Sequence, residues 1–211
     1  MSQYSIVFQN NSSNFGNAAV YQTDANIGVP NVMSLAWFSQ SAYPTTNIVF
    51  DWDVDYSFVW GETGVLIPGV TFSASQTWAA DPVTANQIDL TFAGQPTLVT
   101  PPAFTFTNLT AAGTAGSLTI AQDGTIPMNL GSAGLAVSGS PAFVAPAQPN
   151  INLVFTPHPS YWITFGNYTP GQVLDVESIT NSAQIPFPPN VYTMYATCNA
   201  DNSWSITQAP L

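Results

Sequence analysis

Three aspartates at alternate positions are the residues best suited to chemistry in this 211-residue chain. Asp51, Asp53 and Asp55 lie in the stretch FDWDVDYSF. In an extended strand, residues two apart lie roughly 7 Å from each other on the same face. Oxygen ligands at such close spacing suit a hard cation. Together with Glu62 they occupy positions 1, 3, 5 and 12 counted from Asp51, which is the ligand spacing of a calcium-binding EF-hand loop.

The same stretch also contains features that oppose an EF-hand. Tyr56 stands where that loop requires glycine for its sharp turn, and no helical pattern flanks the aspartates. The simplest interpretation is a solvated acidic face that discourages strand edges from pairing with other chains. Hydrogen bonding of the carboxylates by neighbouring Asn or Thr, or by another subunit, is a further alternative. The cation hypothesis takes calcium, or another cation, with Asp51, Asp53, Asp55 and Glu62 as its ligands; no cofactor is required.

Candidate catalytic residues are few. His158 is the only histidine, held between two prolines, and Cys198 is the only cysteine, so no intrachain disulfide can form. No G-x-S-x-G elbow accompanies His158, and one His with one Cys is too small a set for a zinc site. Spacing alone does not exclude a carboxylate pair of the glycosidase type. We expect a structural loop histidine, a buried cysteine, no catalytic residue and no enzymatic activity.

Charge restricts the partners of this protein. The chain has no lysine or arginine and 11 acidic residues, giving a formal net charge of −11. Without cations it cannot neutralise phosphates, so we expect no nucleic-acid binding. It is also poorly suited to anionic membrane surfaces. No apolar run is long enough to cross a membrane, and the N-terminus lacks the pattern of a signal peptide. We expect an extracellular or cell-surface location reached by a non-classical route, with the cytoplasm as the alternative.

The elements that must position these residues are strands. Apolar and polar residues alternate between clusters of Gly, Pro, Asn and Ser, most clearly from Ile48 to Trp60, where every even position is apolar. This pattern predicts an all-β, antiparallel two-sheet sandwich or jelly roll, as a single domain over residues 1–211. The stretch 94–149, rich in Gly, Ala and Pro, is expected to hold longer loops or weaker edge strands. The predicted strands are 4–9, 18–23, 32–38, 47–60, 65–72, 86–92, 103–107, 117–121, 133–138, 151–156, 160–165, 172–176, 190–198 and 203–207.

Four segments carry a resemblance to a known family. FGNAAVYQTD, GVPNVMSLAWFS, FTPHPSYWITFGNY and IPFPPNVYTM are similar to the RhiA-like proteins, named for a rhizosphere-expressed protein of root-nodulating bacteria. The resemblance covers most of the chain. It implies a microbial protein made in a host- or root-associated setting and regulated with population density. It assigns no residue a catalytic role, and the absence of Lys and Arg departs from what we expect of relatives.

Two functions follow from these observations. Low charge lowers the cost of burying surface between subunits, and long strands offer edges for strand addition. We therefore expect a non-enzymatic structural protein that self-assembles with copies of itself into an extracellular filament, layer or protease-resistant inclusion. The alternative is a soluble, lectin-like carbohydrate-binding protein, because large aromatics beside Asn, Asp and Gln make a stacking surface for sugars.

Overall fold

A computed structural model describes residues 3–24, 31–94 and 101–210 and confirms the all-β prediction. One short 3-10 helix, η1 (Val176–Ser178), accompanies the strands in these residues. The strands are β1 Gln3–Asn10, β2 Gly16–Asp24, β3 Met33–Ser34, β4 Phe38–Ala42, β5 Asn47–Asp53, β6 Tyr56–Gly61, β7 Gln76–Ala80, β8 Gln87–Ala93, β9 Ala103–Thr110, β10 Leu118–Gln122, β11 Ser132–Val137, β12 Ser140–Pro146, β13 Asn152–Phe155, β14 Pro159–Gly166, β15 Ser182–Ile185, β16 Thr193–Cys198 and β17 Trp204–Thr207.

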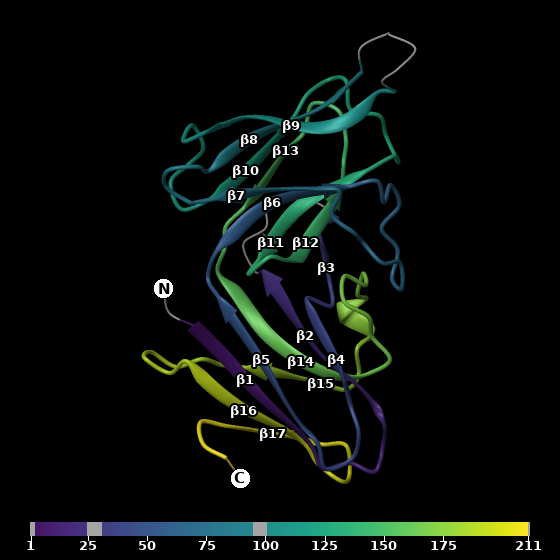
Figure 1. Ribbon diagram of the computed structural model, residues 1–211, viewed down its shortest axis with the longest axis vertical. Helices are drawn as coiled ribbons and strands as arrows, with labels where there is room; N and C mark the ends of the chain where they lie inside the picture. The colour runs from purple at the N-terminus through teal and green to yellow at the C-terminus, as the bar shows by residue number, and fades with distance from the viewer. Residues whose placement is uncertain (1–2, 25–30, 95–100, 211) are drawn as a thin grey trace.

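The described strands form four sheets arranged in two pairs (Figure 1). In the lower half, the sheet β17-β16-β1-β5 faces the sheet β15-β14-β2-β4, so strands from both ends of the chain lie together. In the upper half, β3-β12-β11-β6-β7 faces β13-β10-β8-β9. Most neighbouring strands are antiparallel, but β1 with β16 and β8 with β10 are parallel pairs. Alternating hydrophobicity reports burial and carries no information on strand direction, so the sequence pattern did not reveal them.

Aromatic side chains fill the space inside each pair of sheets. In the lower half the Trp52 and Tyr161 rings lie 5.2 Å apart, and in the upper half the Trp60 and Phe104 rings lie 5.5 Å apart. One continuous cluster of buried side chains draws on all four sheets. Trp37 joins the halves, because its ring contacts Trp52 at 5.2 Å and its indole Nε1 donates to the Val137 carbonyl.

The predicted strand 47–60 is two strands in two different sheets. β5 ends at Asp53 in the lower half, and β6 begins at Tyr56 in the upper half. Between them Val54 is 37% exposed, although its even position predicted burial. We call residues 54–55, where the chain passes from one sheet to the other, the crossing. Ser138 supports it, because its Oγ accepts from the Asp53 amide and its own amide donates to the Asp55 carbonyl. The alternation continues through the crossing because both strands keep even-numbered aromatics in the core.

The stretch 94–149 differs from its prediction, with residues 95–100 outside the described part. Its β11 lies inside a sheet, between β12 and β6, and all six residues are buried. Small residues make this possible: a Cβ on Gly134 would lie 1.9 Å from the carbonyl oxygen of Phe143. The predicted strands 65–72 and 172–176 are also wrong. These two segments bond to each other as loops, with the Gly69 amide donating to the Val173 carbonyl.

Candidate functional site

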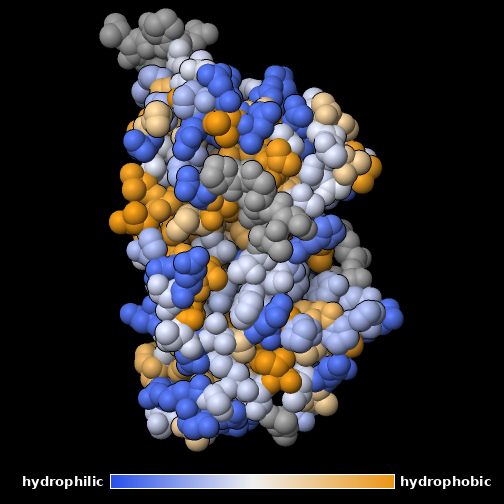
Figure 2. Space-filling view, turned by 180° about the vertical axis from the view of Figure 1, so that it is seen from behind, coloured by the Kyte–Doolittle hydropathy of each residue, from blue (hydrophilic) through white to orange (hydrophobic). Residues whose placement is uncertain are grey.

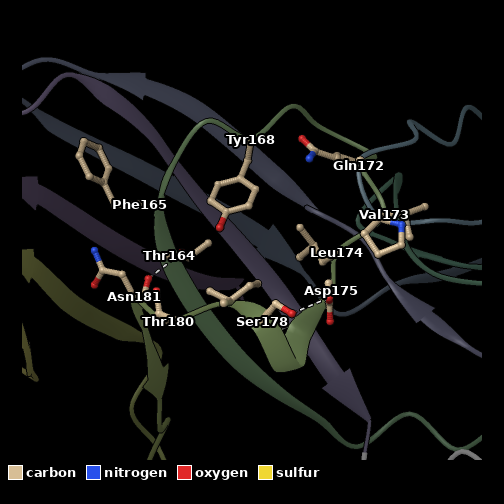
Figure 3. A pocket seen from close by; sticks show the side chains of 13 residues that line it. Thr164, Phe165, Tyr168, Gln172, Val173, Leu174, Asp175, Ser178, Thr180 and Asn181 are labelled. Atoms are coloured by element: carbon tan, nitrogen blue, oxygen red, sulfur yellow. Dashed lines mark hydrogen bonds between the residues drawn. The ribbon is translucent and has the colours of Figure 1, made fainter.

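A shallow hollow lies on the outer face of the sheet β15-β14-β2-β4, against the loop that contains η1. We call it the central hollow; its volume is about 310 Å³. Figure 3 shows the side chains that surround it, with Tyr168 on one side and Asp175 and Ser178 on the other. A volume of this size lies at the lower end of the range of about 300–1,000 Å³ typical of small-molecule sites.

A buried apolar layer forms the floor beneath the hollow. It consists of Ala19, Tyr21, Ala36 and Leu174, and Trp162, Tyr168, Val176 and Ile179 pack against it. The Tyr21 and Trp162 rings stack with their centroids 6.2 Å apart. Burial raises the pKa of the Tyr21 hydroxyl above its ordinary value, so this phenol stays neutral at physiological pH. The floor therefore holds the loop around η1 against the sheet.

Tyr168 is fixed in place by its backbone. Its carbonyl accepts hydrogen bonds from Asn17 Nδ2 at 2.6 Å and from Ser39 Oγ at 2.8 Å, and these donors lie on two different strands. Its ring lies close to Gly166, where an added Cβ would be 3.0 Å from the ring edge. The half-buried ring points its hydroxyl toward Thr164 across the hollow (Figure 3). A ligand would therefore meet a preorganised aromatic surface.

Polar groups on the opposite side are also held in position. The Ser178 hydroxyl donates to Asp175 Oδ2 at 2.6 Å. Asn181 Oδ1 accepts from the indole Nε1 of Trp204 at 2.7 Å, which fixes the amide and leaves its Nδ2 to donate to a ligand. The Thr164 hydroxyl donates to the Asn181 carbonyl at 2.7 Å. These groups offer carboxylate, amide and hydroxyl partners at defined positions.

The central hollow continues at both ends. A hollow of about 380 Å³, which we call the acidic hollow because Asp175 and Glu177 line it, shares Pro68, Leu174 and Asp175 with it. A hollow of about 520 Å³ shares Phe165, Thr180 and Asn181 and is also lined by Asn14 and Asn202; we call it the asparagine hollow. The three hollows together form one trough, and we use that word for them below.

The chemistry of the trough is neutral to anionic. The chain contains no lysine or arginine, and the single histidine lines none of the three hollows. A phosphate or carboxylate ligand would therefore meet no counter-charge and would be repelled by Asp175 and Glu177. A ligand rich in hydroxyl groups is suited to these carboxylate, amide and hydroxyl side chains.

Comparison with known proteins identifies the family. The RhiA family model matches residues 1–209. The chain belongs to the RhiA family. Protein RhiA of Rhizobium leguminosarum bv. viciae is 38% identical over 211 residues, covering 98% of this chain and 87% of that protein. No solved structure matches the chain significantly. The resemblance expected from the four sequence segments is confirmed, while RhiA membership by itself assigns no activity.

In this RhiA family member the four candidate calcium ligands have no common centre. Asp51 and Asp53 lie on β5, Asp55 lies in the crossing, and Glu62 follows the far end of β6. A strand of six residues spans about 20 Å, so Glu62 lies well away from the aspartates. Nowhere in residues 3–24, 31–94 and 101–210 do three His, Cys, Asp or Glu side chains converge as a metal site would require. Calcium binding at these residues stays a prediction.

The other residues singled out from the sequence are His158, Cys198 and the large aromatics. His158 is exposed in the loop before β14, and its backbone amide donates to the Thr156 carbonyl. Cys198 is wholly buried and unpaired, as predicted, and burial raises the pKa of its thiol. Every tryptophan is buried or half-buried, so the exposed aromatics are instead Phe15, Tyr43 and Tyr192 in the described residues.

Sequence reasoning missed Asp175 and Asn181 altogether, and it included Tyr168 only among the large aromatics that could stack on a sugar. The sequence spacing of Tyr168, Asp175 and Asn181 matches no motif, because backbone contacts between loops bring the three residues together. The only local signal is the segment NYTPGQ, whose Asn, Pro and Gly predict a turn. Gly171 in that turn has φ of +79°, and its amide donates to the Ala36 carbonyl.

No helix of the described residues is long and apolar enough to cross a membrane.

Proposed function

We propose that this protein is a carbohydrate-binding protein that holds neutral sugars in the trough. The observation that carries the proposal is the fixed Tyr168 ring facing the oriented polar groups of Asp175 and Asn181 in an open hollow without cations. A sugar presents hydroxyl groups at its edge and C–H groups on its faces. An aromatic ring can cover a face while carboxylate and amide groups bond to the hydroxyls.

The proposal explains why the trough combines these residue types. A purely apolar ligand would displace water from the exposed Asp175 carboxylate and offer no hydrogen bond in return, leaving it only the bond from Ser178. An anionic ligand would be repelled by the same carboxylate. A neutral sugar avoids both costs, because its hydroxyls donate to Asp175 and accept from Asn181 Nδ2. It corresponds to the alternative function expected from the sequence.

A glycan array tests the proposal. The wild-type protein is applied to neutral oligosaccharides of glucose, galactose, mannose and xylose, with sulfated and uronic-acid glycans on the same array. We expect binding to at least one neutral class and none to the anionic glycans. Asn181→Ala and Tyr168→Ala should lower this binding at least tenfold, whereas Val83→Ala, a change at a 65% exposed side chain outside the trough, should leave it unchanged. Absence of binding to every neutral glycan would overturn the proposal.

A second candidate function, homomeric self-assembly, is favoured by an exposed apolar patch on two adjoining loops. The patch consists of Val65, Ile67, Met128 and Leu130, which are 45–64% exposed. The loops touch, because a Cβ on Gly64 would lie 1.9 Å from the carbonyl oxygen of Asn129. The 62–75 loop projects on the right in Figure 1. Figure 2 shows the molecule from behind, so this side lies on the left, where apolar side chains gather at mid-height. Contiguous exposed apolar surface of this kind often marks contact sites between proteins.

Particle mass tests self-assembly independently of sugar binding. Light scattering at rising protein concentration should show species larger than the 22.4 kDa monomer. Ile67→Asp should return the mass to that of the monomer, because a charge in the patch opposes its burial. Val83→Asp adds the same charge at a comparably exposed position outside the patch and should leave the mass unchanged. A monomer at all concentrations would overturn this second candidate.

A further inference from the structure

We infer that the carbohydrate is a linear chain of several sugar units that runs from the central hollow to an aromatic pair at the far end of the asparagine hollow. This inference rests on the proposed function and specifies its ligand. The pair is Phe15 and Tyr43, whose ring centroids lie 4.5 Å apart. Phe15 itself lines the asparagine hollow and is absent from the lining of the central hollow.

The exposure of the two rings singles them out. Phe15 is 58% exposed and Tyr43 is 62% exposed, more than any other described aromatic. Two large rings that contact each other and face solvent leave apolar surface in water, which is unfavourable unless a ligand covers it. Ring faces are the groups that stack on a sugar. A second stacking surface therefore lies beyond the one that Tyr168 provides.

A buried asparagine fixes the backbone next to both rings. Asn10 is wholly buried at the end of β1, and its Nδ2 donates to the Asn14 carbonyl at 2.9 Å and to the Ala42 carbonyl at 3.2 Å. One side chain thus ties the residue before Phe15 to the residue before Tyr43. The backbone that carries the two rings is therefore fixed before a ligand binds, which favours affinity.

Uncharged amide groups line the path between the two stacking surfaces. Asn14 Nδ2 donates to Asn202 Oδ1 at 3.0 Å, and Asn181 lies in both the central and the asparagine hollow. The asparagine hollow has no charged residue in its lining. A neutral chain could exchange hydroxyl hydrogen bonds with these amides along its length. Phe15 lines the asparagine hollow and Tyr168 the central hollow, so successive units of one chain can meet the two rings.

Affinity as a function of chain length tests the inference. The probes are mono- to hexasaccharide ladders of glucose, galactose, mannose and xylose in α and β linkage, titrated by calorimetry. We expect affinity to rise with length until the chain reaches the aromatic pair. Phe15→Ala should weaken binding of the hexasaccharide about tenfold and leave the shortest member that binds measurably unaffected. Phe15→Tyr keeps the ring and should restore the hexasaccharide affinity.

The outcomes separate this inference from the proposed function. If no ladder binds, the proposed function fails. If sugars bind but affinity does not depend on length, or Phe15→Ala weakens short and long chains equally, the linear-chain inference is overturned while sugar binding stands. Thermal melting of each variant beside Val83→Ala confirms that the fold is retained.

Discussion

Gln22 offers the sharpest test of the energetics of this fold. Its side chain lies on β2 opposite Tyr161 of β14, is 0% exposed, and has no hydrogen-bond partner at either Oε1 or Nε2 in the described structure. A buried polar group without a partner costs about 1–3 kcal/mol. Methionine has nearly the same shape and no such requirement. We predict that Gln22→Met raises the free energy of unfolding by about 1–3 kcal/mol.

For a protein of this size, about 1 kcal/mol changes Tm by about 2–4 °C, so the expected increase is about 2–12 °C. Differential scanning calorimetry and urea denaturation measure it. Gln122→Met is the control: Gln122 is 4% exposed and its Nε2 also has no partner in the described structure, but its Oε1 accepts from the Gln148 amide at 2.9 Å. That substitution should give no increase in Tm, because the relief at Nε2 is offset by the loss of the acceptor of the Gln148 amide. A lower Tm for Gln22→Met would refute the reasoning, because it would mean that the Gln22 amide is bonded in the folded protein.

Three further predictions concern the core and the carboxylates. Burial raises the pKa of Tyr161 to about 12 from 10.0, so between these pH values the unfolded chain has released a proton that the folded chain keeps. Stability should therefore fall as pH rises through this window, by about 2–3 kcal/mol more in wild type than in Tyr161→Phe by alkaline urea denaturation; equal slopes would contradict this. Cys198, wholly buried with its pKa raised by burial, should react with a thiol reagent only after unfolding, and rapid reaction of the native protein would show that the site opens. If calcium binds at Asp51, Asp53 and Asp55, as predicted from the sequence, a chelator should lower Tm; an unchanged Tm would contradict that prediction.

The sequence was informative where burial alone decides the outcome. Period-two alternation predicted the all-β class and the strand around Phe50 and Trp52, because a half-buried strand must place its apolar residues on one face. Cys198 was predicted to be buried because an unpaired cysteine behaves as a small hydrophobe. The resemblance to the RhiA family was also visible, because it depends on short segments of sequence that are similar between relatives.

The sequence was uninformative where long-range contacts decide. Alternation from Ile48 to Trp60 could not show that the chain changes sheets at Val54, because the two strands keep the same parity. The trough escaped prediction for a related reason. Tyr168 is held by Asn17 and Ser39, which lie about 150 and 130 residues away along the chain. Such bonds depend on strand order, which no local pattern encodes.

We propose that the trough binds neutral sugar through Tyr168 and Asn181. The most direct measurement is calorimetric titration of the tightest-binding array glycan into wild type, Asn181→Ala and, as an exposed asparagine outside the trough, Asn108→Ala. We expect Asn181→Ala to weaken binding at least tenfold and Asn108→Ala to match wild type. Equal affinities for all three proteins would contradict the proposal, because the sugar would then bind outside the trough.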